Sequence, residues 1–217
     1  EQIAGLGFQA MISYYIISSY LFQMEKSAEI SQQMTGMLRN GTFSKYMVIP
    51  VQTQGYFVAM EVGKLAFSSG IGFLATVLWF CLFRISIVHT VNLKILLCGI
   101  IMVVLGLLFM AQLNYFLGIL TLKFEEISTF LMIKDNLSAV VTGAVIPLAL
   151  LPEWMIAGMR FLPFYYVTYL PSMLFIGKCE DEAVTGLFVL SIWCIFFIVL
   201  NQVTYEHYRI KYDGAGI

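Results

Sequence analysis

The sequence contains little charge. Of its 217 residues only 12% are Asp, Glu, Lys or Arg, whereas 60% are hydrophobic. A water-soluble globule of this length needs far more polar surface, so that class of protein is excluded. The formal net charge is -1 and no long basic run is present, so nothing in the charge pattern favours a nucleic acid as a partner. We therefore predict an integral membrane protein that binds no nucleic acid.

Residues that carry enzyme chemistry are also scarce. The pattern Gly-x-x-x-x-Gly-Lys-Ser/Thr is absent, so this chain cannot itself be a P-loop ATPase. The two histidines, His89 and His207, lie far apart and belong to no metal-ligand motif. The pair Ser68 and Ser69 lacks a basic partner at comparable depth, which favours packing over nucleophilic catalysis. We predict a non-catalytic chain that holds no metal and no cofactor of its own.

The four cysteines show no metal-ligand or CxxC spacing. Three of them lie inside apolar runs, where a thiol packs as a small hydrophobic group. They therefore predict neither a disulfide framework nor a redox compartment; they are Cys81, Cys98, Cys179 and Cys194.

Long charge-free runs divide the chain. A helix needs about 20 apolar residues to cross the hydrocarbon core of a bilayer. Five runs meet this requirement, and one polar segment, residues 24–54, separates the first run from the rest. No internal repeat is visible, which predicts one all-α transmembrane domain over residues 1–217. The predicted spans are residues 3–22, 55–83, 95–122, 127–151 and 183–205.

Basic residues predict the orientation of these spans, because loops on the cytoplasmic side of a membrane carry an excess of Lys and Arg. With residues 24–54 placed in the cytoplasm, eight basic residues fall inside and four outside. The inner set is Lys26, Arg39, Lys45, Lys64, Lys123, Lys134, Arg209 and Lys211, and the outer set is Arg84, Lys94, Arg160 and Lys178.

Prolines interrupt the apolar segment 152–177. Only ten residues separate Pro152 from Pro163 and only seven separate Pro163 from Pro171, so neither piece can cross a bilayer. Each proline also disfavours a helical conformation in the residue before it. We predict a re-entrant helical hairpin that enters from the outer side, turns near residues 161–164 and returns by Gly177. The alternative is an interfacial surface helix followed by a loop.

The last third of the chain carries an ordered set of motifs: Thr142-Gly143, Pro147-Leu148, Pro152-Glu153-Trp154, Leu162-Pro163-Phe164, Pro171 and Gly177. This order resembles that of permease subunits of ABC-2 type exporters. The segment "GTFSKYMVIP" at residues 41–50 is similar to the turn that precedes a span in that family. The end "YEHYRIKYDGAG" at residues 205–216 is similar to its short basic, aromatic and glycine-ended terminus.

This resemblance implies a multi-pass protein of a bacterial cell membrane. It implies six spans in each subunit, a pair of identical or similar permeases that form the substrate pathway, and a separate cytoplasmic ATPase that binds ATP and Mg²⁺. Because the chain begins with Glu1 rather than Met, we expect one further span to precede it. The proline-interrupted hairpin would act as an outer gate, whose residues are Pro152, Trp154, Pro163, Phe164 and Pro171.

The polar segment 24–54 contains an amphipathic pattern. Ile30, Met34, Met37 and Leu38 recur at helical spacing, and the polar residues lie mostly elsewhere around the helix. By resemblance this is the coupling helix that docks on the ATPase; the alternative is a helix that lies on the bilayer surface. The expected ATPase contacts are Glu29, Gln33, Met37, Arg39, Phe43 and Lys45.

Two further features of the spans predict contacts. Small residues at spacings of four, three and four in the second span form a seam that lets another helix approach closely; an intramolecular partner is preferred to a second permease. Lys134 and Asp135 follow an apolar stretch and are expected to line a substrate route or, alternatively, to reach the interface. Glu61 and Lys64 are expected to form an ion pair. The seam residues are Ala59, Gly63, Ala66 and Gly70.

Two other classes of function remain beside the ATP-driven permease. An ATP-independent secondary transporter or channel would use the interrupted segment to bind substrate, although no inverted repeat is visible. An intramembrane enzyme would require a polar triad or metal ligands, which the sequence lacks. The sequence does not identify the substrate; its apolar and aromatic residues suit a lipid, a hydrophobic peptide or a drug.

Overall fold

A computed structural model describes residues 2–3, 6–48, 52–83, 88–124, 127–142, 148 and 151–210. A short antiparallel pair, β1 (Gln2–Ile3) and β2 (Leu6–Gly7), precedes the helices. The helices follow in the order α1 (Phe8–Met24), α2 (Ala28–Arg39), α3 (Ser44–Val48), α4 (Thr53–Phe83), α5 (Leu93–Leu120), α6 (Ser128–Val141), α7 (Glu153–Met159), the 3₁₀ helix η2 (Pro163–Tyr166), α8 (Tyr169–Phe175), the 3₁₀ helix η3 (Glu180–Glu182) and α9 (Ala183–Arg209).

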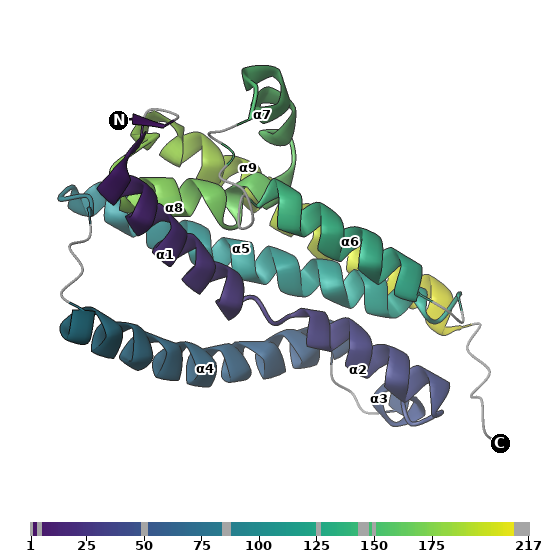
Figure 1. Cartoon of the computed structure of the whole chain (residues 1–217). Coiled ribbons are helices and arrows are strands. Elements are labelled where there is room, and N and C mark those ends of the chain that lie inside the picture. The colour runs from purple at the N-terminus through teal and green to yellow at the C-terminus, as the bar shows by residue number, and fades with distance from the viewer. Residues whose placement is uncertain are drawn as a thin grey trace.

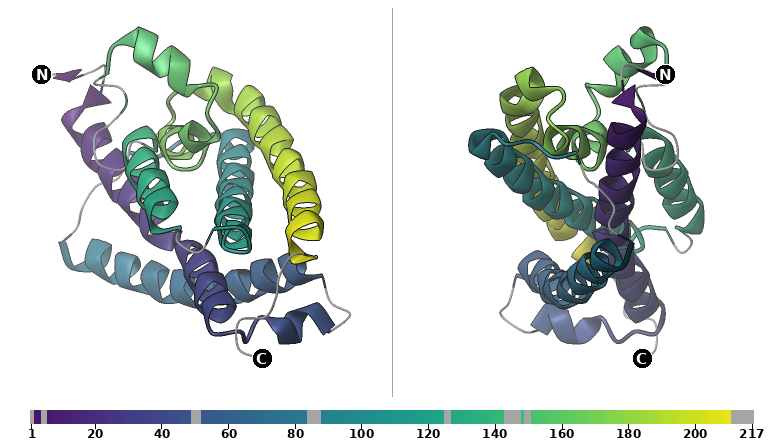
Figure 2. Two further views of the ribbon diagram at one scale, coloured as in Figure 1. Left: turned by 90° about the vertical axis from the view of Figure 1, so that its right-hand side faces the viewer. Right: turned by 60° about the vertical axis from the view of Figure 1, so that its left-hand side comes forward.

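Helices α5 and α9 form the centre of the bundle and run side by side (Figures 1 and 2). Phe109 of α5 meets Phe197 of α9 edge to face, with ring centroids 5.5 Å apart. The helices can approach closely because α9 presents Gly186, where an added Cβ would lie 2.7 Å from Met102 Cε. Helix α1 covers α8 on the other side, where Tyr14 is fully buried. The all-helical fold class is therefore confirmed.

Helix α4 lies apart from this bundle. In Figure 1 it runs below the other helices and approaches them through α1, α2 and α5. Its first turns carry Phe57, which is buried with residues of α2 and α5. Most of its later large apolar side chains, including Phe67 and Leu74, are exposed. In a membrane protein such a helix contacts lipid or a further protein chain.

Three helices of the described residues are long and apolar enough to cross a membrane: Thr53–Trp79 within α4, Leu93–Leu120, and Glu180–Arg209 with the turn before α9. Helices α1 and α6 form within the other two predicted spans. They contain 17 and 14 residues, which is shorter than the roughly 20 that a span requires. The prediction of five spans stays a prediction, and parts of the fourth, residues 143–147 and 149–150, lie outside the described residues.

The prolines divide the segment 152–177 into short pieces, as expected from their geometry. Pro152 is the N-cap of α7, Pro163 begins η2 and Pro171 lies in the first turn of α8. Helix α8 ends at Phe175, and Gly177 two residues later has a φ of 75°, the left-handed conformation that glycine tolerates. The N–H of Gly177 donates to Leu174 O and that of Lys178 donates to Met173 O, which together form a Schellman motif.

The predicted inner ends of the helices gather at one end of the molecule. Figure 1 shows α2 and α3 beside the C-terminal ends of α5 and α9, whereas α7 and α8 lie toward the opposite end. The described basic residues follow the same division, with Lys45 and Lys123 at one end and Lys94 and Lys178 at the other. The last residues of the predicted terminal motif, 211–217, lie outside the described residues, as does Arg84.

Candidate functional site

Helix α2 has one buried and one exposed face. Ile30 and Met34 are fully buried and Leu38 is 4% exposed, in a cluster with Ala111, Tyr115 and Ile119 of α5. The partly buried Met37 packs against the same cluster. The apolar stripe of α2 is therefore covered by protein within this chain, which argues against a helix that inserts its stripe into the bilayer surface.

The opposite face of α2 carries most of the expected coupling residues. Glu29, Arg39 and Lys45 are exposed and Gln33 is partly exposed. Phe43 requires a correction, because its side chain is 0% exposed and its ring packs 6.5 Å from the Tyr205 ring of α9. A residue buried in this way anchors the turn after α2 and cannot contact a partner in this conformation.

Polar contacts fix α2 to α5 at two points along the helix. Before its first turn, Asn114 Nδ2 of α5 donates to Ser27 Oγ at 2.7 Å. In its second turn, Thr35 Oγ1 lies 3.0 Å from Thr121 Oγ1, just after the end of α5. Between these contacts Gly118 allows close packing, since an added Cβ would lie 2.8 Å from Met34 Sδ. A displacement of α2 therefore moves α5.

A charged contact joins α2 to α4. Lys64 Nζ lies 2.6 Å from Glu29 Oε2 and 3.9 Å from Glu61 Oε2. The expected pair of Glu61 and Lys64 is therefore present at the limit of an ion pair, while the shorter contact reaches across to α2. The Glu61 side chain is 0% exposed, and neither of its oxygens accepts a hydrogen bond within the described part of the chain. Lys64 is thus shared between an exposed carboxylate and a buried one.

The small-residue seam of α4 faces outward. Ala59, Gly63, Ala66 and Gly70 are all exposed. An added Cβ at Gly63 or at Gly70 would meet no atom of the described chain within 4 Å. The preferred intramolecular partner is therefore absent among the described residues, because α4 turns this face away from the bundle.

The residues of the expected outer gate divide into two groups. Pro163, Phe164 and Pro171 are buried in the bundle, and the Phe164 ring centroid lies 5.7 Å from that of Phe109 on α5. Pro152 and Trp154 are exposed, the latter by 75%, on or beside the outlying helix α7.

A polar clasp that the sequence did not predict holds the turn between these two groups. Arg160 Nη2 lies 2.5 Å from Glu182 Oε1 at the start of α9. Tyr165 Oη donates to the other oxygen of the same carboxylate at 3.0 Å, and Tyr166 Oη donates to Arg160 O at 2.8 Å. Local spacing could not predict this contact, because the ion-pair partners are 22 positions apart in the sequence.

Lys134 and Asp135, the expected pathway charges, pair with each other. Lys134 Nζ lies 2.5 Å from Asp135 Oδ1; the lysine side chain is 7% exposed and the aspartate side chain 62% exposed. Neither residue lines the groove that lies between α1 and α4. The pair satisfies a buried ammonium group on α6, and its role in a route stays a prediction.

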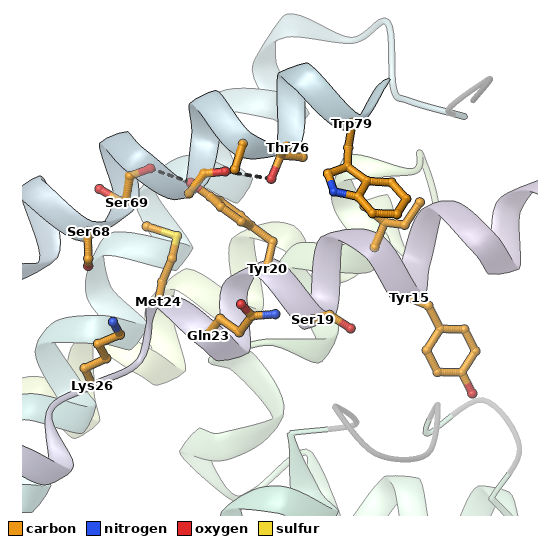
Figure 3. Close-up of a pocket in the computed structure, with 13 residues that line it drawn as sticks. Tyr15, Ser19, Tyr20, Gln23, Met24, Lys26, Ser68, Ser69, Thr76 and Trp79 are labelled. Carbon is orange, nitrogen blue, oxygen red and sulfur yellow. Dashed lines mark hydrogen bonds between the residues drawn. The ribbon is translucent and has the colours of Figure 1, made fainter. Parts of the chain in front are cut away.

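The larger groove lies between α1 and α4 and has a volume of about 710 Å³ (Figure 3). We call it the α1–α4 groove. Tyr20 bridges its two helices, because its hydroxyl donates to Ser69 O at 3.0 Å. The middle of α4 and the C-terminal part of α1 contribute polar side chains, and Lys26 stands at the end where α1 stops. The polar lining is Ser19, Gln23, Lys26, Ser68, Ser69 and Thr76 together with the hydroxyl-bearing Tyr15 and Tyr20, and the apolar lining includes Ile16, Ala75 and Trp79.

The comparison with protein families decides the identity. Residues 1–216 match the family model described as ABC-2 family transporter protein. The chain belongs to the ABC-2 transporter family. Neither a curated protein nor a solved structure gives a significant match to it.

Membership makes this ABC-2 chain a permease component of an ABC transporter, a multi-pass membrane protein of a family that associates with ABC ATPase subunits. Such components are membrane transport elements and are generally non-catalytic. Four features of the structure are candidates for a role in such a permease. They are the exposed polar face of α2, the outward seam of α4, the turn after α7 that Arg160 and Glu182 hold, and the α1–α4 groove.

Proposed function

We propose that the chain is the permease subunit of an ATP-driven exporter, which forms the substrate pathway together with a second permease. ATP and Mg²⁺ are bound and used by a separate cytoplasmic ATPase. The observation that carries this proposal is that α2 has two different faces: its apolar side is buried on α5, and its polar side is exposed. A soluble motor can move a membrane helix only through such direct contacts.

The ATPase would dock on the exposed polar face of α2 and its continuation into α3. Glu29, Gln33, Arg39 and Lys45 supply groups of both signs and an amide, which suits a polar protein surface better than an anionic membrane surface. Met37 lies at the edge of this face, because it also packs on the α2–α5 cluster. Phe43 contributes by anchoring the turn between α2 and α3.

Movement would pass from α2 into the spans by two routes. The first leads through Gly118 and the hydrogen bond of Asn114 with Ser27 into α5. The second leads through Lys64 into α4. Displacement of Glu29 by the ATPase would release Lys64 toward the buried Glu61, whose carboxylate accepts no hydrogen bond in the described chain. The exchange would keep the ammonium group paired in both positions, which offsets part of the cost of removing it from water.

The second permease would pack on the outward seam of α4. Close approach of helices in lipid depends on small residues, and this seam presents four of them with no described neighbour in the chain. The substrate would pass along the α1–α4 groove. The buried part of the outer gate, Pro163, Phe164 and Pro171, would open when the clasp of Arg160 with Glu182 is released.

The test is purification of the membrane complex under mild conditions, followed by identification of retained proteins. The proposal predicts that a soluble P-loop ATPase is retained and that Glu29→Lys combined with Arg39→Glu releases it. Lys94→Glu at the opposite end is the matched control and should retain it. Full transport without nucleotide, with no ATPase bound to the wild-type chain, contradicts the proposal and favours a secondary transporter or channel.

A further inference from the structure

The α1–α4 groove combines a single charge with a mainly apolar wall. Lys26 is the one charged residue in its lining, and no carboxylate lines it in the part of the chain that the structure describes. Figure 3 shows Lys26 at the end where α1 stops, below Ser68 and Met24. Its side chain is exposed, so the ammonium group is accessible to a molecule in the groove.

Most hydroxyl protons of the groove are already used within the protein. Ser68 Oγ, Ser69 Oγ and Thr76 Oγ1 donate to carbonyl groups of their own helix, to Leu65 O, Ala66 O and Gly72 O respectively. Tyr20 Oη donates to Ser69 O. The groups left to donate to a ligand are therefore the Lys26 ammonium and the Gln23 amide at one end, and the hydroxyls of Ser19 and Tyr15 farther along α1.

The other end of the groove is apolar and aromatic. Ile16 of α1 and Ala75 and Trp79 of α4 line this part. At the narrow middle, the Tyr20 ring lies close to Gly72, where an added Cβ would be 3.2 Å from Tyr20 Cε2. The groove volume of about 710 Å³ falls within the range of ligand sites, roughly 300–1,000 Å³. Its shape suits a molecule with one polar end and a long or flat apolar body.

We propose that the α1–α4 groove binds an amphipathic organic anion, with its acidic head at Lys26 and its apolar body against Ala75 and Trp79. This inference rests on the proposed function, because the groove lies on a substrate route only if the chain is a permease. The charge of the lining selects an anion over a cation, since a cationic head would lie beside Lys26 without a carboxylate to pair with. The same chemistry is available from a free amphipath and from an anionic phospholipid of the bilayer.

The experiment uses Trp79 as a reporter. The full chain with Trp154→Phe and Trp193→Phe, which leaves Trp79 as its one tryptophan, is placed in phosphatidylcholine nanodiscs without ATPase or nucleotide. Titration with dibromostearate is expected to quench Trp79 fluorescence saturably. Loss of a charge-assisted hydrogen bond in Lys26→Gln should weaken the apparent affinity about tenfold. Lys26→Arg should retain the affinity and show that the variants fold, and Lys94→Gln is the matched control far from the groove.

The sign of the charge gives a second readout. Lys26→Glu should abolish saturable quenching by dibromostearate and permit it by a brominated alkyltrimethylammonium of equal length. Quenching that is linear in probe concentration and equal in wild type and Lys26→Gln would overturn the proposal, because it reports partition into lipid alone. Equal affinity of the wild type for the anionic and cationic probes would overturn it as well.

The source of the anion is distinguished by lipid composition. If an anionic phospholipid is the natural occupant, nanodiscs that contain phosphatidylglycerol should abolish quenching by dibromostearate, whereas a site for a free amphipath should keep it. Both results place an anion in the groove. Because no ATPase is present, a failure to recruit an ATPase would refute the proposed function without changing these titrations.

Discussion

Lys64 of α4 forms ion pairs with Glu29 of α2 and with Glu61 of its own helix. The sequence predicted its pairing with Glu61, because the two residues are three positions apart on one helix face. It could not predict the 2.6 Å contact with Glu29, because the two residues are 35 positions apart and lie on different helices. Pairings of this kind depend on how helices pack, which local spacing does not encode.

Removing the Lys64 charge should therefore cost more than the loss of one surface contact. Lys64→Gln leaves the buried Glu61 carboxylate without its only ion-pair partner in the described chain, and we expect a loss of about 1–2 kcal/mol in unfolding free energy. Glu61→Gln added to Lys64→Gln should recover most of it, because the unpaired buried charge is gone. Thermal unfolding in detergent of the wild type, the two single variants and the double variant gives a double-mutant cycle. If the losses of stability in the two single variants add up in the double variant, the proposed interaction between Glu61 and Lys64 is contradicted.

Cys179 gives a pH prediction outside the spans. Burial, with the neighbouring Glu182 and Asp181 carboxylates, raises the pKa of its thiol to about 11. The thiolate is the reactive form, so the pKa shift lowers its population at neutral pH. In a variant with Cys81, Cys98 and Cys194 replaced by Ala, the iodoacetamide rate should still be rising at pH 10. A plateau near pH 9 would show an ordinary thiol.

At the scale of elements, the apolar runs of the sequence predicted where helices form. They did not predict which faces of those helices are buried within the chain. The amphipathic pattern of residues 30–38 correctly identified the stripe of α2, because that stripe is the face buried on α5. The segment 152–177 breaks at Pro152 and Pro163 as predicted, whereas Pro171 lies inside the first turn of α8, and the re-entrant hairpin stays a prediction. The outward direction of the α4 seam could not be predicted, because small residues permit close packing without specifying the partner.

The packing of α2 on α5 yields a prediction for Gly118. Gly118→Val places atoms where Met34 already lies, so α2 should loosen from α5 at a cost of about 1–3 kcal/mol. Hydrogen exchange should increase within residues 28–39, and Met34→Ala in the same chain should reverse much of the increase. Gly36→Ala is the matched control, since an added Cβ there meets nothing within 4 Å. Unchanged exchange in Gly118→Val would contradict this close contact.

At the scale of the whole molecule, the charge bias of the sequence predicts that Lys45 and Lys178 lie on opposite sides of the membrane. Lys45 and Lys178 are exposed at opposite ends of the bundle. In a chain without other cysteines, Lys178→Cys should react with a membrane-impermeant maleimide in intact cells. Lys45→Cys should react only after permeabilisation. Reaction of both positions in intact cells, or reaction of Lys45→Cys alone, would contradict the proposed orientation.

The central claim is that the exposed face of α2 receives the force of a separate ATPase. A photoreactive amino acid at Gln33, which is partly exposed on that face, tests it in intact cells. Leu190 of α9, which is fully buried, is the control position. We predict that illumination joins position 33 to a protein that contains a nucleotide-binding P-loop, and that position 190 gives no such product. Adducts from position 33 that contain lipid alone, with no nucleotide-binding protein, would contradict the claim.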